Sequence, residues 1–292
     1  MANETSLYQE QWDSRVMAVY QQKGFLTKGM AMPPAKIVGK KMHYSIVGKG
    51  EAQDYTPRDK VKTMNLVKGQ IEIDATEWDA ADYIYDYDLD RMPVTVKDAT
   101  VEAAAAALGR KHDKVLYAKM QAKDFNAIGQ VVGSFAAASG PSEMLKGRRL
   151  LFNQDVPVED GQNFCGLPPI VFDTMMSYNV FSNSQWTGGN LPFADGMRRR
   201  TWQNIHFFEL PVYLQSVSGT DGKFYMWHRS ALGTGITGEE IKTGWKYELE
   251  FKRWYYQSTI SAGATLIEEA TVQPKPGIVE IRYKADVEPT FT

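Results

Sequence analysis

The chain has one cysteine, almost no net charge and no long apolar run, and each shortage excludes a class of protein. Cys165 is the single cysteine among 292 residues, which excludes an intramolecular disulfide framework and a cysteine-based zinc site. We expect it to be a small buried side chain. The 33 basic and 35 acidic residues leave a formal net charge of −2, so no global charge attracts nucleic acid or an anionic membrane.

Segments for membrane insertion or secretion are also missing. No stretch approaches the ~18–20 consecutive apolar residues of a membrane span. The N-terminus, MANETSLYQEQWD, is polar and predicts no signal peptide. With a hydrophobic content of 43% and a charged content of 23%, the composition is that of a globular protein. We therefore expect a soluble protein, made inside a cell, without a membrane partner.

The motifs of common metal and catalytic sites are incomplete. The histidines never occur at the i, i+4 spacing of a zinc helix; they are His43, His112, His206 and His228. Asp86, Asp88 and Asp90 have the spacing that begins a calcium loop. However, Arg91 stands where that loop needs glycine, and Lys97 where it needs glutamate. No G-x-S-x-G nucleophile motif is present. We expect no metal, no catalytic residue and no enzyme activity.

One pattern favours a cofactor, because Gly233, Gly235 and Gly238 match G-x-G-x-x-G. In a dinucleotide site a long helix must follow these glycines and receive the pyrophosphate at its N-terminus. Here EEIKTGW is too short for such a helix before a strand begins at Trp245. A glycine-rich turn between strands is the simpler interpretation. An NAD-dependent oxidoreductase is the alternative from another class.

The strongest signal in the sequence is a long helix over residues 97–123. Alanine, the best helix former, fills residues 103–107, and lysines gather toward the C-terminal end, where the helix dipole favours them. Asp98 or Thr100 is expected to cap the first turn. A narrow apolar stripe follows helical spacing through Val101, Ala104, Ala105, Leu108, Val115, Leu116 and Met120. The helix predicts a structural strut.

Residues 36–73 predict a two-stranded excursion around a polar centre, EAQDYTPR. An isolated hairpin is only marginally stable in water, so this one needs a surface to lie on. Lysines occur along both strands. They either discourage unwanted strand pairing or complement an acidic neighbour. Tyr85 to Asp90 alternates apolar and acidic residues and predicts a strand with one acidic and one apolar face.

The remaining segments predict a mixed α and β protein without regular β-α-β alternation. The first 35 residues carry the large side chains of Tyr8 and Trp12 but are too short to form a core of their own. The rest of the chain or a neighbouring subunit must therefore bury these side chains. A helix capped by Ser142 is expected before Pro157, then a short strand in NFCGLPP and a helix with proline in its first turn. Aromatic strands follow in TWQNIHFFELPVYLQ, GKFYMWHRSAL, GWKYELEFKRWYYQST and GIVEIRYKADV.

This order of parts resembles the major capsid protein of tailed double-stranded DNA bacteriophages, the Hong Kong 97 fold. Local resemblance lies in ALGRKHDKVL, RRLLFNQDVPVEDG and TWQNIHFFELP. It implies an α+β fold with an N-terminal arm (1–35), an extended E-loop hairpin (36–72), a peripheral domain with the spine helix (73–124), an axial domain (125–257), and peripheral return strands with the C-terminus (258–292).

The same resemblance implies self-assembly through hexamers and pentamers into an icosahedral shell around double-stranded DNA, within a virion made in the host cytoplasm. Portal, scaffold and non-specifically bound DNA are the implied partners. An encapsulin-like compartment is the alternative within the fold. The candidate intersubunit contacts are Tyr8, Trp12, Lys40, Lys41, Lys49, Asp86, Asp88, Asp90, Arg198, Arg199 and Arg200.

Overall fold

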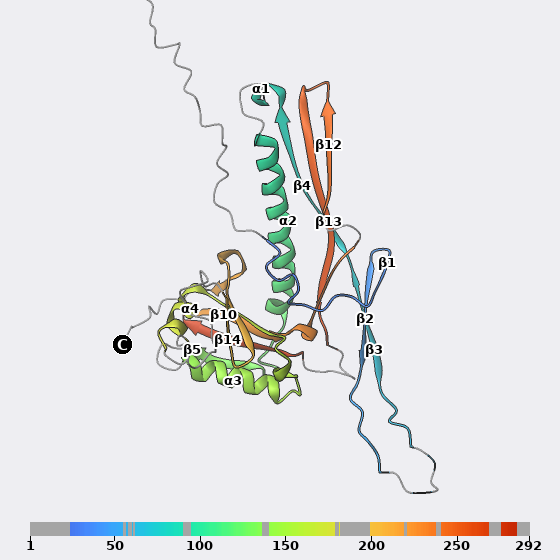
Figure 1. Ribbon diagram of the computed structural model, residues 1–292, viewed down its shortest axis with the longest axis vertical. Helices are drawn as coiled ribbons and strands as arrows, with labels where there is room; N and C mark the ends of the chain where they lie inside the picture. The colour runs from blue at the N-terminus through green and yellow to red at the C-terminus, as the bar shows by residue number, and fades with distance from the viewer. Residues whose placement is uncertain are drawn as a thin grey trace, which may run out of the picture. The chain divides into compact units, whose positions relative to one another are not determined.

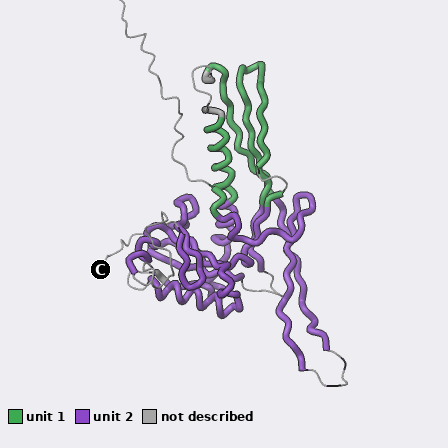
Figure 2. Tube along the Cα trace, in the orientation of Figure 1, with its two compact units in different colours: residues 1–26, 76–112, 236–262 green, residues 27–75, 113–235, 263–292 purple. Residues whose placement is uncertain are grey.

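The computed structural model describes residues 24–54, 57, 60, 62–89, 95–135, 140–178, 181, 199–218, 221–237, 241–268 and 276–284. The chain divides into two compact units (Figure 2). Unit 1 comprises Met1–Leu26, Thr76–His112 and Ile236–Ala262, and unit 2 comprises Thr27–Ala75, Asp113–Gly235 and Gly263–Thr292. Each unit is therefore assembled from segments far apart in the sequence.

Unit 1 contains long antiparallel strands and the first part of the long helix (Figure 1). Strand β13 (Arg253–Leu266) pairs with β4 (Thr76–Tyr85) on one side and with β12 (Lys242–Glu248) on the other. The one-turn helix α1 (Asp86–Leu89) follows β4, and α2 spans Thr95–Ala122. Leu108 of α2 is buried with Ile260 and Ala262 of β13, so the helix and the strand share an apolar core.

Gly109, an apparent weak point in α2, lies where another part of unit 1 crosses the helix closely. A Cβ atom added to Gly109 would lie 2.8 Å from the Cα atom of Gly24, a distance that real Cβ contacts do not reach. Phe25, with a φ of 59°, places its ring 5.5 Å from that of His112. The glycine is therefore required by the crossing, despite its helix propensity.

Unit 2 is built on a seven-stranded sheet in which β5 (Val131–Phe135), β14 (Ile278–Lys284), β10 (Asp221–His228), β6 (Asn163–Leu167), β8 (Ile205–Glu209) and β7 (Arg199–Trp202) lie side by side. Strand β9 (Ser216–Ser218) pairs with β10. The pairs β6–β8 and β5–β14 are parallel and the others antiparallel. Helices α3 (Gly140–Phe152) and α4 (Pro169–Met176) contact each other, and α3 also contacts β14, β5 and β10.

The central strand β10 is buried on both faces, which explains its unbroken run of large residues. Successive strand residues point to opposite faces. Phe224 and Met226 join the core that includes α3 and α4. Trp227 packs edge-on against Tyr117 from the C-terminal part of α2, at 6.0 Å between ring centroids, and Tyr225 lies at 6.3 Å from the same ring. Unit 2 thus has helical layers over both faces of one sheet.

The third sheet has three strands in the order β1 (Lys36–Val38), β2 (Lys41–Val47) and β3 (Lys68–Asp74). Strands β2 and β3 pair antiparallel from Lys41↔Asp74 to Val47↔Lys68. The described residues also include β11 (Leu232–Ile236), which pairs with β13, and 3₁₀ turns at Val158–Asp160, Val212–Leu214 and Arg229–Ala231.

Residues 27–34 pack on the rest of unit 2 through the buried residues Thr27, Met30 and Ala31, and specific hydrogen bonds hold them there. Asp113 of α2, with no exposed surface, accepts hydrogen bonds from the Thr27 N–H (3.1 Å), the Thr27 hydroxyl (2.6 Å) and the Tyr213 hydroxyl (3.0 Å). The indole N–H of Trp227 donates to the carbonyl of Met30 at 3.0 Å. Part of the predicted N-terminal arm is thus packed against its own chain.

Several sequence expectations need correction. The predicted strand through Asp90 ends at Tyr85, where the Asp86 N–H donates to the Lys252 carbonyl and α1 begins; Asp90 lies outside the described residues. Helix α2 starts at Thr95, so Asp98 and Thr100 lie within it and do not cap it. Helix α3 starts at Gly140, ahead of Ser142. The segment GWKYELEFKRWYYQST forms two paired strands because the chain turns at residues 249–252.

Gly109→Ala tests the close crossing in unit 1. Helix propensity alone predicts a gain of about 1 kcal/mol in stability. We expect a loss of about 1–3 kcal/mol, because overpacking at a backbone contact outweighs propensity. Urea denaturation measures the difference, and Ala118→Gly, on an exposed turn of α2, shows the size of the propensity effect. Stabilisation by Gly109→Ala would show that Gly24 does not lie against the helix.

Candidate functional site

The hairpin of β2 and β3 has a buried base and an exposed outer part. Met42 and Tyr44 of β2 are 0% and 1% exposed, and Ile46 is 8% exposed. At the end of β2 and beyond the strands, Val47, Met64 and Val67 are 57%, 55% and 51% exposed. Figure 2 shows the described parts of this loop, residues 48–54 and 62–67, projecting from the rest of unit 2. The expectation that the whole hairpin lacks support in its own chain is therefore wrong for its base.

The base lies on strands that carry glycine in place of side chains. Gly233 and Gly235 of β11 face Tyr44 and Met42, and an added Cβ atom would lie 2.8 Å from the Tyr44 ring and 2.6 Å from the Met42 sulfur. These glycines therefore belong to a strand and not to the predicted turn. Because the hairpin fills the space above them, their spacing reflects packing; Gly238 lies outside the described residues.

A second exposed apolar area lies at the end of the unit 1 sheet, where β4 meets α1 and β12 meets β13. Its large exposed side chains are Tyr83, Tyr85, Tyr87, Leu249 and Phe251. The guanidinium of Arg253 lies 3.7 Å above the Tyr83 ring and 4.5 Å from the Phe251 ring, while its Nε donates to Glu248. Leu249, at 80% exposure, is uncovered in the free chain. We name these five side chains the apolar end of unit 1.

Two of the charged candidates, Lys41 and Lys49, form ion pairs within their own unit. Lys41 pairs with Glu72 at 3.3 Å, and Lys49 pairs with Asp155. Asp86 accepts a hydrogen bond from the Tyr247 hydroxyl. Asp88 lies in α1. The lysine side chains are 56% and 72% exposed, so these contacts can exchange with partners from another molecule. Lys40 lies in the turn between β1 and β2.

The two described arginines of the run at 198–200 differ in burial. Arg199 is exposed, but Arg200 is 7% exposed and lies 5.7 Å over the ring of Phe181. Burial lowers the pKa of Arg200. The difference arises because successive residues of β7 point to opposite faces, one of which joins the core. Arg198, Tyr8 and Trp12 lie outside the described residues.

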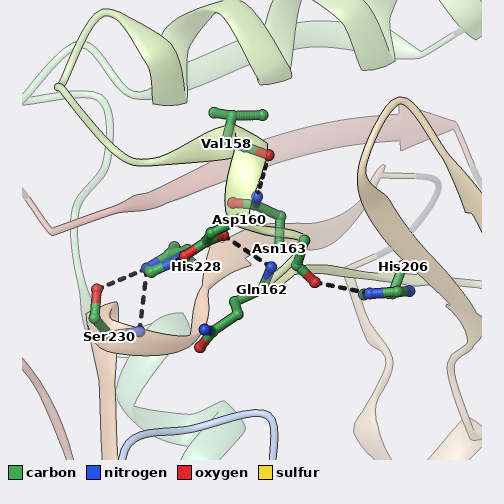
Figure 3. A network of polar contacts seen from close by, with 8 residues as sticks. Val158, Asp160, Gln162, Asn163, His206, His228 and Ser230 are labelled. Atoms are coloured by element: carbon green, nitrogen blue, oxygen red, sulfur yellow. Dashed lines mark hydrogen bonds and ion pairs between the residues drawn. The ribbon is translucent and has the colours of Figure 1, made fainter.

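A network of polar contacts surrounds the residues that lead into β6 (Figure 3). His228 Nε2 lies 2.9 Å from Asp160 Oδ2, and His228 Nδ1 accepts from the Ser230 N–H at 3.2 Å. The Gln162 N–H donates to Asp160 Oδ1 at 2.9 Å, and His206 Nε2 lies 2.8 Å from the Gly161 carbonyl. Every contact joins strand ends or turns, so the network fixes the loop that leads into β6.

Cofactor and metal sites are not evident in the described part of the chain. No group of three or more His, Cys, Asp or Glu side chains there could hold a metal ion. A shallow groove of about 370 Å³ along β12 is lined by Lys242, Thr243, Gly244, Trp245, Lys246, Tyr255, Gln257 and Thr259, which include no carboxylate, imidazole or thiol. Within the described ranges, no helix combines the length and apolar content that crossing a membrane requires.

Comparison with known proteins decides the family. The sequence profile described as phage capsid protein matches residues 5–284. The chain belongs to the phage capsid protein family. A search of curated proteins found no match.

Solved capsid structures share the fold over almost the whole chain. The capsid of Ralstonia phage GP4 superposes with a TM-score of 0.74 at 11% identity, covering 97% of each chain. The cyanophage Pam1 capsid gives 0.70 at 12% identity, covering 98% of this chain and 99% of that one. The cyanophage P-SCSP1u capsid gives 0.67 at 13%, covering 96% and 93%. The expected α+β capsid fold and the role of major capsid protein are confirmed.

Sequence reasoning missed several residues that position these surfaces. Asp113 gave no signal, because a single aspartate in a long helix normally faces solvent. The close approach of Gly24 to Gly109 joins residues 85 positions apart. Gly263 belongs to no sequence motif, although a Cβ atom added to it would lie 3.3 Å from the Asp74 carbonyl oxygen. Only the pair of Gly233 and Gly235 carried a visible pattern, and it predicted a turn between strands, with a cofactor site as the alternative; a glycine within a strand can also mark the close approach of another group.

Asp160→Asn tests the polar network through pH. Burial tends to raise the pKa of Asp160, but hydrogen bonds from the Gln162 N–H and from His228 outweigh it and lower the pKa. A lowered folded pKa stabilises the protein above the unfolded value of about 3.9 and loses this effect as pH falls through the folded value. We therefore expect Asp160→Asn to lower the melting temperature at pH 7 and to approach the parent below about pH 4.

The control for this measurement is Asp221→Asn, which removes an exposed pair with Lys284 and is expected to change the melting temperature little. An Asp160→Asn penalty that stayed constant down to pH 3 would contradict the assignment of the stabilising charge to Asp160.

Proposed function

We propose that this capsid protein assembles through hexamers and pentamers into an icosahedral shell around double-stranded DNA, and that it acts there without catalysing a reaction. The observation that carries the proposal is the outer part of the hairpin, residues 48–67, which continues past a well-buried base and leaves large apolar side chains uncovered. Membership of the phage capsid protein family supports it.

The physical argument starts from the instability of a two-stranded ribbon in water. Val47, Met64 and Val67 are each more than half exposed, and covering them gives about 25 cal/mol for each Å² of apolar surface buried. The described part of the same unit does not cover these side chains. A neighbouring copy supplies the missing apolar surface, so the loop buries these side chains only in the assembly.

The apolar end of unit 1 is the second contact surface in this proposal. Its exposed aromatic side chains and Leu249 are the kinds of residue that anchor protein interfaces. The lysines of the hairpin, Lys40, Lys41 and Lys49, meet acidic residues such as Asp86, Asp88 and Asp90 of another copy. Each exposed pair contributes only about 0–1 kcal/mol, so the charges set register more than strength.

The proposed partners follow from the shell. Tyr8 and Trp12 of the N-terminal arm pack on a neighbouring subunit, and Arg198 and Arg199 complete the contacts between copies. A portal and a scaffold direct assembly in the host cytoplasm, and the mature shell holds DNA non-specifically in the virion. Nuclease-protected DNA in purified shells separates this function from that of a compartment for protein cargo.

Replacing residues 48–67 by Asn-Gly tests the hairpin as an assembly element. Val47 and Lys68 are paired, so a two-residue turn closes the shortened hairpin without strain. We expect a folded protein with an unchanged melting temperature that forms no shells, whereas the parent forms them. Analytical ultracentrifugation and electron microscopy measure both properties.

The control replaces only Val212, an exposed side chain elsewhere in unit 2, by serine, and is expected to assemble like the parent. Normal shells from the shortened protein would contradict the proposed role of the hairpin. A parent that stays monomeric under all salt conditions would contradict self-assembly itself.

A further inference from the structure

Three glycines from two strands form the surface on which the hairpin rests. Gly233 and Gly235 lie in β11 and Gly263 in β13, and all three belong to unit 2. We call them the glycine seat. None of them has a positive φ, so the backbone does not require glycine at these positions. What excludes a side chain is the hairpin itself.

Each glycine of the seat faces a different part of the hairpin or its approach. A Cβ atom on Gly233 would lie 2.8 Å from Cε1 and Cζ of Tyr44, and one on Gly235 would lie 2.6 Å from the Met42 sulfur and 2.9 Å from Pro34. A Cβ atom on Gly263 would lie 3.3 Å from the carbonyl oxygen of Asp74, the C-terminal residue of β3. The seat thus contacts both strands of the hairpin.

Hydrogen bonds fix the chain around the glycine seat. A side chain added to the seat must therefore displace the hairpin. The Met32 N–H donates to the Leu232 carbonyl at 2.7 Å, and the Thr234 N–H donates to the Met32 carbonyl at 3.1 Å. The Thr234 hydroxyl donates to the Gly263 carbonyl at 3.3 Å. Strand β11 is therefore held from two sides, and a side chain added to it pushes β2 outward.

We propose that the glycine seat sets the direction in which the hairpin leaves unit 2, and thereby the diameter of the assembled shell. Met42 and Tyr44 are about 7 Å apart along the strand, so a displacement of about 1 Å at one of them rotates the hairpin by roughly 8°. Ten further residues extend about 30 Å, which turns that rotation into a movement of about 4 Å at the tip.

A movement of this size changes where the tip meets its neighbour. In a closed shell of hexamers and pentamers a similar contact is repeated around the shell, so a small change in angle between neighbours accumulates into a different radius or prevents closure. This inference rests on the proposed contact between the hairpin and a neighbouring copy. The glycines are then positioning residues for assembly, acting through Met42 and Tyr44.

Gly233→Ala is the main test, because the rigid Tyr44 ring cannot move aside as a flexible side chain can. Gly263→Ala is the milder variant, since its closest contacts at 3.3 Å require a shift of only a few tenths of an ångström. The matched control is Gly133→Ala in β5, where an added Cβ meets nothing within 4 Å. Electron microscopy measures shell diameter, and circular dichroism confirms folding.

The direction of the hairpin is measured separately in unassembled protein. Spin labels on Glu51→Cys and Glu159→Cys, both exposed positions of unit 2, report the distance between the loop and the body. Cys165 is buried with no exposed surface, and its thiol pKa is raised by burial, so it does not take the label.

We expect Gly233→Ala to shift the spin-label distance by several ångström and to give shells of altered or mixed diameter, with Gly263→Ala changing both in the same direction by less. Adding Tyr44→Leu to Gly233→Ala removes the ring contact and returns both measurements toward the parent. Folded variants with the parental distance and diameter would overturn the proposal, as would a shifted distance with an unchanged diameter. A parent that forms no shells would instead overturn the proposed function.

Discussion

The architecture depends on one constraint: a two-stranded ribbon cannot hold itself in water and needs a surface beneath it. This chain supplies that surface only at the base, where Met42 and Tyr44 are buried over strands without side chains. Past Val47 the support ends and apolar side chains become exposed. The boundary between the supported and unsupported parts of the hairpin divides what one chain stabilises alone from what requires another copy.

The base of the hairpin is well supported because unit 2 beneath it is closely packed. A single sheet carries large residues on both faces of β10, and the C-terminal part of α2 covers one of them. Asp113 fixes the segment that leads to the hairpin by accepting three hydrogen bonds in a fully buried position. A buried carboxylate without such donors would cost several kcal/mol, so its partners are required. The segment that precedes β1 therefore enters the hairpin from a fixed point.

The sequence predicted those parts whose signal is local. Alanine-rich periodicity predicted α2, and alternating residues predicted β2 and β3, because both patterns follow from the backbone geometry of one segment. The prediction of a strand through Asp90 was wrong. The alternating pattern continues past Tyr85, but the strand ends there, where the Asp86 N–H donates to the Lys252 carbonyl. Gly233 and Gly235 predicted a turn between strands, with a nucleotide site as the alternative, but both lie within β11, facing Tyr44 and Met42. Long-range contacts such as Thr27 with Asp113 leave no pattern in either segment. The contacts between copies stay predictions.

Hydrogen exchange along the hairpin tests the central claim most directly. The amides of β2 and β3 take part in a buried ladder and should be protected in free subunits and in shells alike. The amides of residues 48–67 should exchange freely in subunits and become protected on assembly. Equal exchange of residues 48–67 in both states would contradict the account, because the outer hairpin would then find no partner in the shell.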